Sequence, residues 1–257
     1  MHTALMRVDV ITAVHAAYAR FLPFAWASLR EQSYRDWTWL VQLDGPQAEV
    51  LDALSRCGAL REPRVRVAAN GTHDGPATTR NIALGGASAP LVHSLDADDE
   101  LEPDALALLV EALQTHPTAG FAVGHVRDLL VTGELREHRL PVPAGVLPRG
   151  VLLTEWMTNP GEYRLPVHPA AVMWRRSLLL SVGAWSALHG MEDTGLLMAA
   201  SATSAGVLLK EPTLRYRKHP GQRSAQESKF SGGGAQIALV RQRAAVLGAG
   251  PAWSPAG

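Results

Sequence analysis

Short apolar runs alternate with longer segments of helical periodicity over the first 113 residues. The apolar runs are Val8–Val14, Thr38–Leu43, Val65–Ala68 and Leu91–Leu95. The segments between them, with apolar residues at helical spacing, are Arg20–Gln32, Ala48–Cys57 and Ala77–Gly85. Strands that alternate with helices form a mostly parallel sheet, because each crossover returns the chain to the same end of the sheet. The sequence therefore predicts a Rossmann-like α/β fold, with ligand-binding loops at the carboxyl ends of the strands.

Size and charge narrow the classes of protein to which the chain can belong. With 257 residues and 47% hydrophobic content, it can bury one sizeable core. Lys plus Arg and Asp plus Glu both number 24, so the net charge is zero and no nucleic-acid partner is expected. The single Cys57 excludes an intramolecular disulfide and a cysteine-rich zinc site, and it favours a reducing compartment, the cytoplasm.

No segment has the pattern of a membrane span or a secretion signal. The longest apolar stretches, such as Ala105–Leu113, are far shorter than the ~20 residues that a membrane-spanning helix requires. The first 20 residues lack an uninterrupted apolar region followed by a small-residue cleavage pattern. We therefore expect no transmembrane segment, and the sequence leaves the oligomeric state open.

The second half of the chain has a weaker pattern. Pro103 favours the start of a helix that runs to about residue 113, and repeated Pro and Gly between residues 120 and 164 favour loops and short strands. A helix is predicted over Glu192–Ala202, with strands near Val207 and Leu214. We expect one domain over residues 1–247, with a nucleotide-binding half (1–116), a smaller acceptor-binding half (117–219), a flap with a C-terminal helix (220–247), and then a flexible tail (248–257).

Three carboxylates, those of Asp96, Asp98 and Asp99, directly follow the fourth apolar run. Such a concentration of like charge is unfavourable unless a cation offsets it. Mg²⁺ and Mn²⁺ prefer oxygen ligands from one or two carboxylates, and phosphates with water complete their shell. A nucleoside diphosphate fits this requirement. In isolation the same acids fit a polar turn that caps the next helix, so the neighbouring motifs decide between these interpretations.

Further motifs accompany the acidic cluster along the chain. They are Val8-Asp9-Val10-Ile11, Gln42-Leu43-Asp44-Gly45, the segment from Gly75 to Arg80-Asn81, and Glu192-Asp193. In this order and spacing, the set resembles the inverting family 2 glycosyltransferases of the GT-A fold over residues 7–220. The resemblance implies a metal-dependent enzyme that moves a sugar from a nucleotide diphosphate sugar to a hydroxyl group.

The resemblance also implies roles for the matching donor-side residues. Asp44 matches an acidic residue that recognises the nucleoside, and Arg80 matches a basic residue near the donor base and phosphates. Asp96, Ala97 and Asp98 match the DXD motif, in which Asp98 would meet Mn²⁺ or Mg²⁺ and Asp96 would lie toward the ribose or the sugar. An arginine also suits this place chemically, because its planar fork of donors matches anionic oxygens.

A carboxylate is also needed on the acceptor side, because inversion requires attack from the face opposite the diphosphate. Glu192 and Asp193 open a helix after a glycine-containing loop, where the helix dipole favours an ionised carboxylate. Without the upstream motifs, the two acids would only complement that dipole. The resemblance selects Asp193 as the general base and gives Glu192 a supporting role.

The sequence departs from the family pattern at the end of the first strand. Ala13-Val14-His15-Ala16 stands where the family usually has a Pro-Thr-Tyr-Asn-like run. Val14 and His15 would line the base pocket, so the nucleobase stays open, with uridine as the first expectation. Near the end of the domain, His219 could complete the metal shell or lie exposed in a basic turn. The segment Pro220–Gly234 is expected to close as a flap over the donor.

The acceptor side carries fewer signals. Aromatic faces suit sugar rings, and a histidine can contact a hydroxyl, so the candidates are Trp156, Trp185, His168 and His189. Each of these residues could equally serve in packing. The acceptor is therefore open and could be a small molecule, a lipid-linked saccharide or a polysaccharide.

Two other functions fit part of the pattern. A sugar-phosphate nucleotidyltransferase also combines an α/β sheet with metal-binding acids, but it would need a glycine-rich phosphate loop after the first strand. The segment Val14–Tyr18 contains no glycine, which also argues against a dinucleotide oxidoreductase. A catalytically silent sugar-nucleotide-binding protein would retain the fold alone. The presence of both acidic motifs argues against that alternative.

Overall fold

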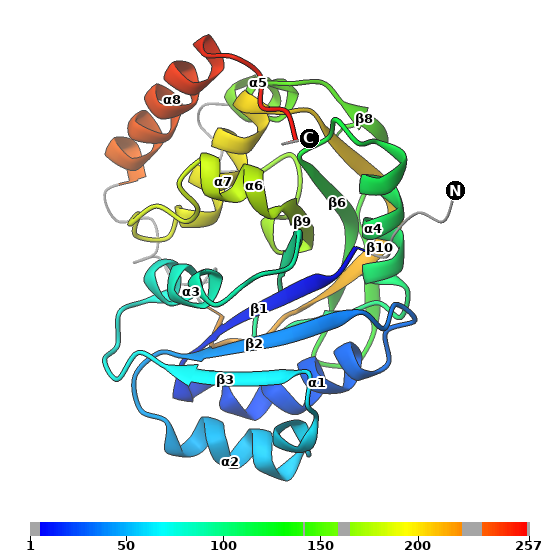
Figure 1. The fold of residues 1–257 in the computed structure, drawn as a ribbon, viewed down its shortest axis with the longest axis vertical. Coiled ribbons are helices and arrows are strands. Elements are labelled where there is room, and N and C mark those ends of the chain that lie inside the picture. The colour runs from blue at the N-terminus through cyan, green and yellow to red at the C-terminus, as the bar shows by residue number, and fades with distance from the viewer. Residues whose placement is uncertain (1–5, 141, 159–164, 223–232, 256–257) are drawn as a thin grey trace.

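The computed structural model describes residues 6–140, 142–158, 165–222 and 233–255 (Figure 1). Its centre is one sheet in the order β3-β2-β1-β4-β9-β6-β10-β5, with β7 on β6 and β8 on β10. The first four strands are β1 (Val8–Val14), β2 (Trp37–Leu43), β3 (Val65–Ala69) and β4 (Leu91–Ser94). All their mutual pairings are parallel. The predicted α/β fold with a Rossmann-like, mostly parallel central sheet is therefore confirmed.

Helices cover both faces of this parallel part. The 3-10 helix η1 (Ala16–Phe21), α1 (Leu22–Arg30), α2 (Ala48–Arg56) and the 3-10 helix η2 (Ala59–Arg61) follow strands that progress outward from β1. Helix α3 (Pro76–Gly85) instead returns the chain to β4 on the other side of β1. Because such crossovers are right-handed, α3 lies on the face opposite α1 and α2, as Figure 1 shows. The carboxyl ends of β1 and β4 thus flank a switch point, where ligands bind in open α/β sheets.

The second half extends the sheet. β9 (Val172–Arg175) is antiparallel to both β4 and β6 (Phe121–Leu129). The long strand β10 (Gly206–Arg217) pairs parallel with β6 and antiparallel with β5 (Glu100–Leu101) and β8 (Gly145–Leu147), while β7 (Leu135–Glu137) is antiparallel to β6. The remaining helices are α4 (Ala105–Thr115), α5 (Val151–Thr158), the 3-10 helix η3 (Pro169–Ala171), α6 (Arg176–Ser181), α7 (Glu192–Thr203) and α8 (Gly233–Ala249).

The prediction of loops and short strands over residues 120–164 was wrong in part. β6 is a nine-residue strand inside the sheet, and α5 is a helix. Gly124 lies inside β6, where its role is close packing rather than a turn. A Cβ atom at this position would lie 2.0 Å from Thr213 Oγ1 on β10, so only glycine allows the two strands to approach.

Two other boundaries differ from the predictions. The strands expected near Val207 and Leu214 form one strand, β10, with register shifts around Pro212. Helix α4 begins at Ala105 rather than Pro103, because the Glu102 N–H still donates to the Thr213 carbonyl of β10 at 3.0 Å. The Glu102 carbonyl then accepts the Ala105 N–H at 3.0 Å, so a turn precedes the helix.

The segment from residue 248, expected to be a flexible tail, contacts the domain as far as Trp253. Helix α8 continues to Ala249, and the Trp253 N–H donates to the Thr203 carbonyl at 2.9 Å. The Arg149 guanidinium donates to the carbonyls of Gly248 and Gly250, both at 2.8 Å. None of the helices in the described ranges has the length and apolar character needed to cross a membrane.

Candidate active site

A cavity of about 1050 Å³ lies at the carboxyl ends of the central strands. Seven donor-side candidates line it: Val14, His15, Asp44, Arg80, Asp96, Ala97 and Asp98. From the other half, Glu192, Asp193, His168 and His189 line the same cavity. The fold therefore brings the two acidic motifs, almost a hundred residues apart in the sequence, to one site.

The acidic loop follows β4, and its aspartate side chains become more buried along the chain. The side chains of Asp96 and Asp98 are 31% and 15% exposed, whereas Asp99 is fully buried. Asp99 Oδ1 accepts the Arg217 backbone N–H at 2.9 Å. Burial, and then the neighbouring Asp98 and Asp96, raise the pKa of Asp99 well above its usual value. Asp99 thus anchors the loop, and Asp96 and Asp98 are the carboxylates that face the cavity.

Asp98 and His219 form a pair that suits a divalent cation. Asp98 Oδ2 and His219 Nε2 lie 3.0 Å apart, and the histidine side chain is only 8% exposed. Burial and the neighbouring Asp96 raise the pKa of Asp98, and His219 opposes this rise. Since a cation would favour the ionised carboxylate, it would relieve this unfavourable charge. Within the described ranges no three His, Cys, Asp or Glu side chains converge on one metal position, so phosphates and water would complete the shell.

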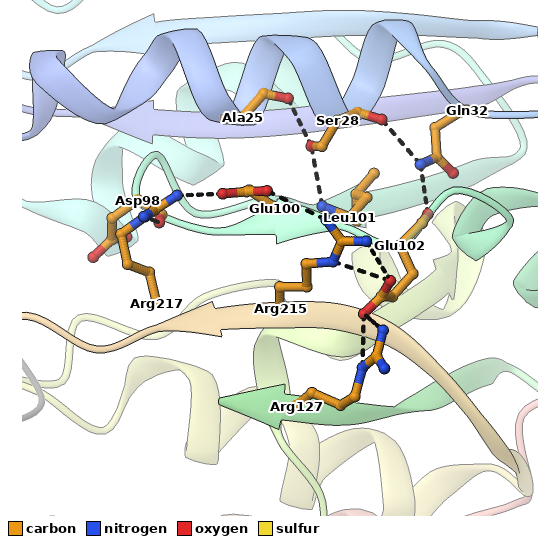
Figure 2. A network of polar contacts seen from close by, with 10 residues as sticks. All are labelled: Ala25, Ser28, Gln32, Asp98, Glu100, Leu101, Glu102, Arg127, Arg215 and Arg217. Atoms are coloured by element: carbon orange, nitrogen blue, oxygen red, sulfur yellow. Dashed lines mark hydrogen bonds and ion pairs between the residues drawn. The ribbon is translucent and has the colours of Figure 1, made fainter. Parts of the chain in front are cut away.

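A network of ion pairs joins the acidic loop to β10, the strand that precedes His219 (Figure 2). We call this network the ladder, and its members are Glu100, Glu102, Arg127, Arg215 and Arg217. Glu102 accepts from Arg127 Nε at 2.9 Å and from Arg215 Nε at 3.0 Å. Glu100 pairs with Arg217 and lies 3.6 Å from Arg215. Arg217 in turn donates from Nε to the Asp98 carbonyl at 2.9 Å. Because these side chains are largely buried, the ladder fixes where Asp98 and the end of β10 lie relative to each other.

Arg80 connects the two acidic motifs directly. Its NH2 group lies 2.7 Å from Asp96 Oδ1, and its NH1 group lies 3.3 Å from Asp193 Oδ1 and 3.7 Å from Glu192 Oε1. Burial disfavours the charged guanidinium, but the carboxylates of Asp193, Asp96 and Glu192 outweigh that effect and raise its pKa. The side chain is 8% exposed. Arg80 is therefore a buried hub, that is, one guanidinium that contacts three carboxylates. Its predicted contact with donor phosphates stays a prediction.

Asp193 lies in the first turn of α7 and faces the cavity more than its neighbour does. Its side chain is 32% exposed, compared with 4% for Glu192. The carboxylate accepts from the Trp185 indole N–H at 2.9 Å. Burial raises the pKa of Asp193 to about 6, with Glu192 and Asp96 adding to the rise and Arg80 and Trp185 opposing it. A carboxylate with this pKa is ionised at neutral pH and still basic enough to accept a proton.

The side of the cavity that was predicted to hold the nucleoside is built around Asp44. Its Oδ1 atom accepts the N–H groups of Asp74 at 2.7 Å and Gly75 at 3.2 Å, so it holds the loop that leads into α3. His73 Nε2 lies 3.3 Å from Asp44 Oδ2, and the rings of His73 and His15 lie 4.7 Å apart. Asp44 is therefore a loop anchor in the cavity wall, and its predicted contact with a nucleoside stays a prediction.

The acceptor candidates divide into two groups. His168 and His189 line the cavity. Trp156 and Trp185 are 4% and 3% exposed and belong to the hydrophobic core, and neither is part of the cavity wall formed by the described residues. Trp185 reaches the site indirectly: its indole N–H donates to Asp193, and the Arg80 guanidinium carbon lies 5.9 Å from its ring centroid. The expected flap falls mainly on residues 223–232, outside the described residues; Gln222, just before them, lines the cavity.

Several cavity residues were missed by sequence reasoning. Asp74 and His73 directly precede the Gly75 motif, and this proximity was an available signal. Asp128 and His138 come from β6 and the segment after β7, and their side chains lie 3.0 Å apart. No signal pointed to this pair, because the region was expected to form loops and short strands.

Comparison with known proteins gives the same family as the motifs. The family model described as glycosyl transferase family 2 matches residues 9–178. The chain belongs to this family. The match includes Asp44, Arg80, Asp96 and Asp98, and it ends before Glu192. The predicted family resemblance is therefore confirmed, and the base assignment depends on the geometry of α7.

Two curated relatives match about 110 residues each. The O-antigen biosynthesis protein RfbC of Myxococcus xanthus is 34% identical over 110 residues, which are 43% of this chain and 9% of that protein. The uncharacterized protein y4gI of Sinorhizobium fredii is 30% identical over 112 residues, which are 44% of this chain and 12% of that protein. The matched segments are thus about a tenth of the length of these relatives.

Solved structures of S. aureus TarS have the same fold. The structure of TarS 1-349 has a TM-score of 0.71 at 16% identity and covers 95% of this chain and 70% of its own. The complex with UDP-GlcNAc has a TM-score of 0.70 at 17% identity, with coverages of 94% and 66%. At these identities the likeness concerns the fold alone, and it confirms the predicted GT-A architecture.

Proposed function

We propose that this chain is a metal-dependent, inverting glycosyltransferase that uses a UDP-sugar and a hydroxyl acceptor. The observation that carries the proposal is the Arg80 hub, which holds Asp96 of the acidic loop and Asp193 of α7 at one cavity. Family membership supports the reaction class. The TarS structures with UDP-GlcNAc and UDP, which share the fold, support a uridine nucleotide as the first donor to test.

The chemistry divides between the two sides of the cavity. Asp98 and His219 would hold Mn²⁺ or Mg²⁺, which supplies positive charge to the departing diphosphate when bound. Asp193 accepts the proton of the acceptor hydroxyl as its oxygen bonds to the anomeric carbon. The bond from that carbon to the diphosphate oxygen breaks on the opposite face, so the configuration inverts. The proton then leaves Asp193 for solvent after the product departs.

A binding experiment tests the donor and the metal. UDP and UDP-sugars are screened by thermal shift, each with Mn²⁺ and with a chelator. At a ligand concentration of 100 Kd, a native-state ligand adds about 2.7 kcal/mol, or roughly 5–10 °C for a chain of this size. We expect this shift only with the metal, and Asp98→Asn and His219→Ala should remove it. An equal shift in the chelator would contradict metal dependence.

A turnover experiment tests the reaction. Product formation from the donor identified by binding is followed across an acceptor panel, and Asp193→Asn should lower transfer by roughly 10²–10⁴-fold with donor binding retained. Asp52→Asn, a carboxylate change on the surface of α2, is the matched control. Pyrophosphate formation from a nucleoside triphosphate and a sugar phosphate would favour the nucleotidyltransferase alternative. Donor binding without transfer or hydrolysis would favour a silent binding protein.

A further inference from the structure

The turn before α7 has an unusual backbone conformation. Gly183 and Ala184 have φ angles of 79° and 50°, and Ala184 is the one residue other than glycine with positive φ in the described part of the chain. A side chain makes this conformation unfavourable, so it persists only where surrounding contacts hold it. Residues held in such strained conformations cluster at functional sites. The next residue is Trp185, whose indole reaches Asp193.

Asn81 holds this turn from α3. Its Nδ2 group donates to the Trp185 carbonyl at 2.8 Å, and its Oδ1 atom accepts the Trp185 backbone N–H at 3.1 Å. A side-chain amide that bonds both backbone groups of one residue fixes that residue in place. Asn81 directly follows Arg80, whose guanidinium lies 3.3 Å from Asp193. Helix α3 therefore contacts the Asp193 carboxylate directly through Arg80. It also contacts this carboxylate indirectly, because Asn81 holds Trp185.

Both contacts use the same oxygen of Asp193. The Trp185 indole N–H lies 2.9 Å from Oδ1, and the Arg80 NH1 group also donates to Oδ1 at 3.3 Å. Among the described residues, no hydrogen-bond donor reaches Oδ2. An oxygen that already accepts two donors is less available, so Oδ2 is the atom that can take a proton from an acceptor hydroxyl.

We propose that Asn81 and Trp185 are positioning residues for Asp193. Asn81 stabilises the strained 183–185 turn, and the turn places the indole N–H on Oδ1 so that Oδ2 faces the acceptor. This inference rests on the proposed role of Asp193 as the general base. It also gives a function to Asn81, the second member of the Arg80-Asn81 motif, which the proposed reaction leaves without a role.

Loss of the indole N–H has a measurable consequence at Asp193. A donor on a carboxylate favours the ionised form, so its removal raises the pKa of that carboxylate. The other charged groups around Asp193 are Arg80 from α3, Asp96 from the acidic loop and Glu192 from α7, and His189 lines the same cavity. All of them remain when only Trp185 is changed. The Arg80 guanidinium carbon also lies 5.9 Å from the Trp185 ring centroid, so phenylalanine, which keeps an aromatic ring there, removes the N–H with little change to Arg80.

The test measures the pKa of Asp193 and the transfer reaction in the same proteins. Trp185→Phe and Asn81→Ala are compared with the wild type by ¹³C NMR of the carboxyl groups, with Asp193→Asn used to assign the signal. We expect the pKa to rise by about one unit in both variants. The apparent pKa of the acid limb of the pH–rate profile for transfer should rise by the same amount. At pH 8.5, kcat should still fall by roughly tenfold because the base is misoriented, with KM for the donor unchanged.

Two further proteins separate positioning from general packing. In the double variant of Asn81→Ala and Trp185→Phe, the pKa should rise no further than in Trp185→Phe, because Asn81 acts through Trp185. Trp174→Phe changes an equally buried tryptophan on β9 and should leave the pKa of Asp193 unchanged. If Trp185→Phe fails to fold, 3-benzothienylalanine at position 185 keeps the ring shape and removes only the N–H.

The outcomes distinguish this inference from the proposed function. An unchanged pKa of Asp193 in Trp185→Phe and in the benzothienyl protein would overturn the positioning role, whether or not the chain transfers sugar. A raised pKa in Asn81→Ala without a change in the kcat of transfer would overturn it as well. By contrast, near-native transfer by Asp193→Asn would refute the base itself, and that result can be read independently of the NMR titration.

Discussion

Replacing Asp193 with asparagine should stabilise the fold while it stops transfer. Burial raises the pKa of this carboxyl from its ordinary value of 3.8 to about 6. A carboxyl with a raised folded-state pKa favours folding fully below the unfolded value, and this contribution is lost as the pH rises through the folded value. Above pH 6 the wild type therefore carries an unfavourable charge. Asparagine lacks that charge, and its side-chain oxygen can still accept the Trp185 N–H.

The magnitude follows from the difference between the two pKa values. Roughly two pKa units at 1.36 kcal/mol each give about 3 kcal/mol, and solvent contact of a side chain that is 32% exposed lowers this toward about 2 kcal/mol. We expect Asp193→Asn to be more stable than the wild type by this amount at pH 8. The difference should shrink as the pH falls and disappear below about pH 3, where the wild-type carboxyl is protonated in both the folded and the unfolded state.

Urea unfolding at pH 8, 6 and 4.5 measures the difference. The surface variant Asp52→Asn serves as the control, and its unfolding free energy should stay within about 0.5 kcal/mol of the wild type at each pH. The reasoning is refuted if Asp193→Asn is less stable than the wild type at pH 8. It is equally refuted if the stability difference does not shrink as the pH falls.

Three further predictions concern the ladder, the sheet and the base. Glu102→Gln should lower the unfolding free energy by about 3–5 kcal/mol in urea titrations, because it leaves Arg127 and Arg215 without their shared carboxylate; a loss below about 1 kcal/mol would contradict the ladder. Gly124→Ala should cost about 1–3 kcal/mol, measured as a lower Tm, since the new Cβ overlaps Thr213, whereas Gly85→Ala on α3 meets no atom within 4 Å and should be neutral or stabilising. Finally, kcat/KM for transfer should fall about tenfold per pH unit below about pH 6, because Asp193 must be ionised to accept a proton; a rate that is flat down to pH 5 would contradict the assignment.

The first half of the chain could be predicted from sequence because each element carries its own local pattern. β1 has the predicted bounds Val8–Val14, and α3 starts one residue before the prediction. The second half depends on contacts between distant segments, which periodicity does not record. Gly124, for example, lies inside β6, and the Thr213 side chain on β10 is what requires a glycine there.

The site shows the same division. The motifs identified Asp96, Asp98 and Asp193 as cavity residues, since acids after a strand and at a helix start have a recognisable local context. Their partners were not recognisable. The sequence placed Arg80 near the donor phosphates, whereas the structure places it among three carboxylates. Trp185 was a candidate for either acceptor contact or packing. The structure buries its ring in the core, where the indole N–H contacts Asp193 and the ring lies 5.9 Å from the Arg80 guanidinium carbon.

The contact between Asp98 and His219 has a consequence for the order in which the parts of the protein fold. The two residues are separated by 121 positions, and β10, which leads to His219, is the last strand of the sheet. During synthesis the strands β1 to β4 can pair while the ribosome still holds the rest of the chain. The Asp98–His219 pair and the ladder contacts of Arg215 and Arg217, however, require a loop of more than a hundred residues to close. A nascent chain that ends at residue 178 would contain the whole segment matched by the family model and yet lack both His219 and Asp193. The proposed catalytic centre is therefore completed only when the segment from α7 to His219 docks against the first half.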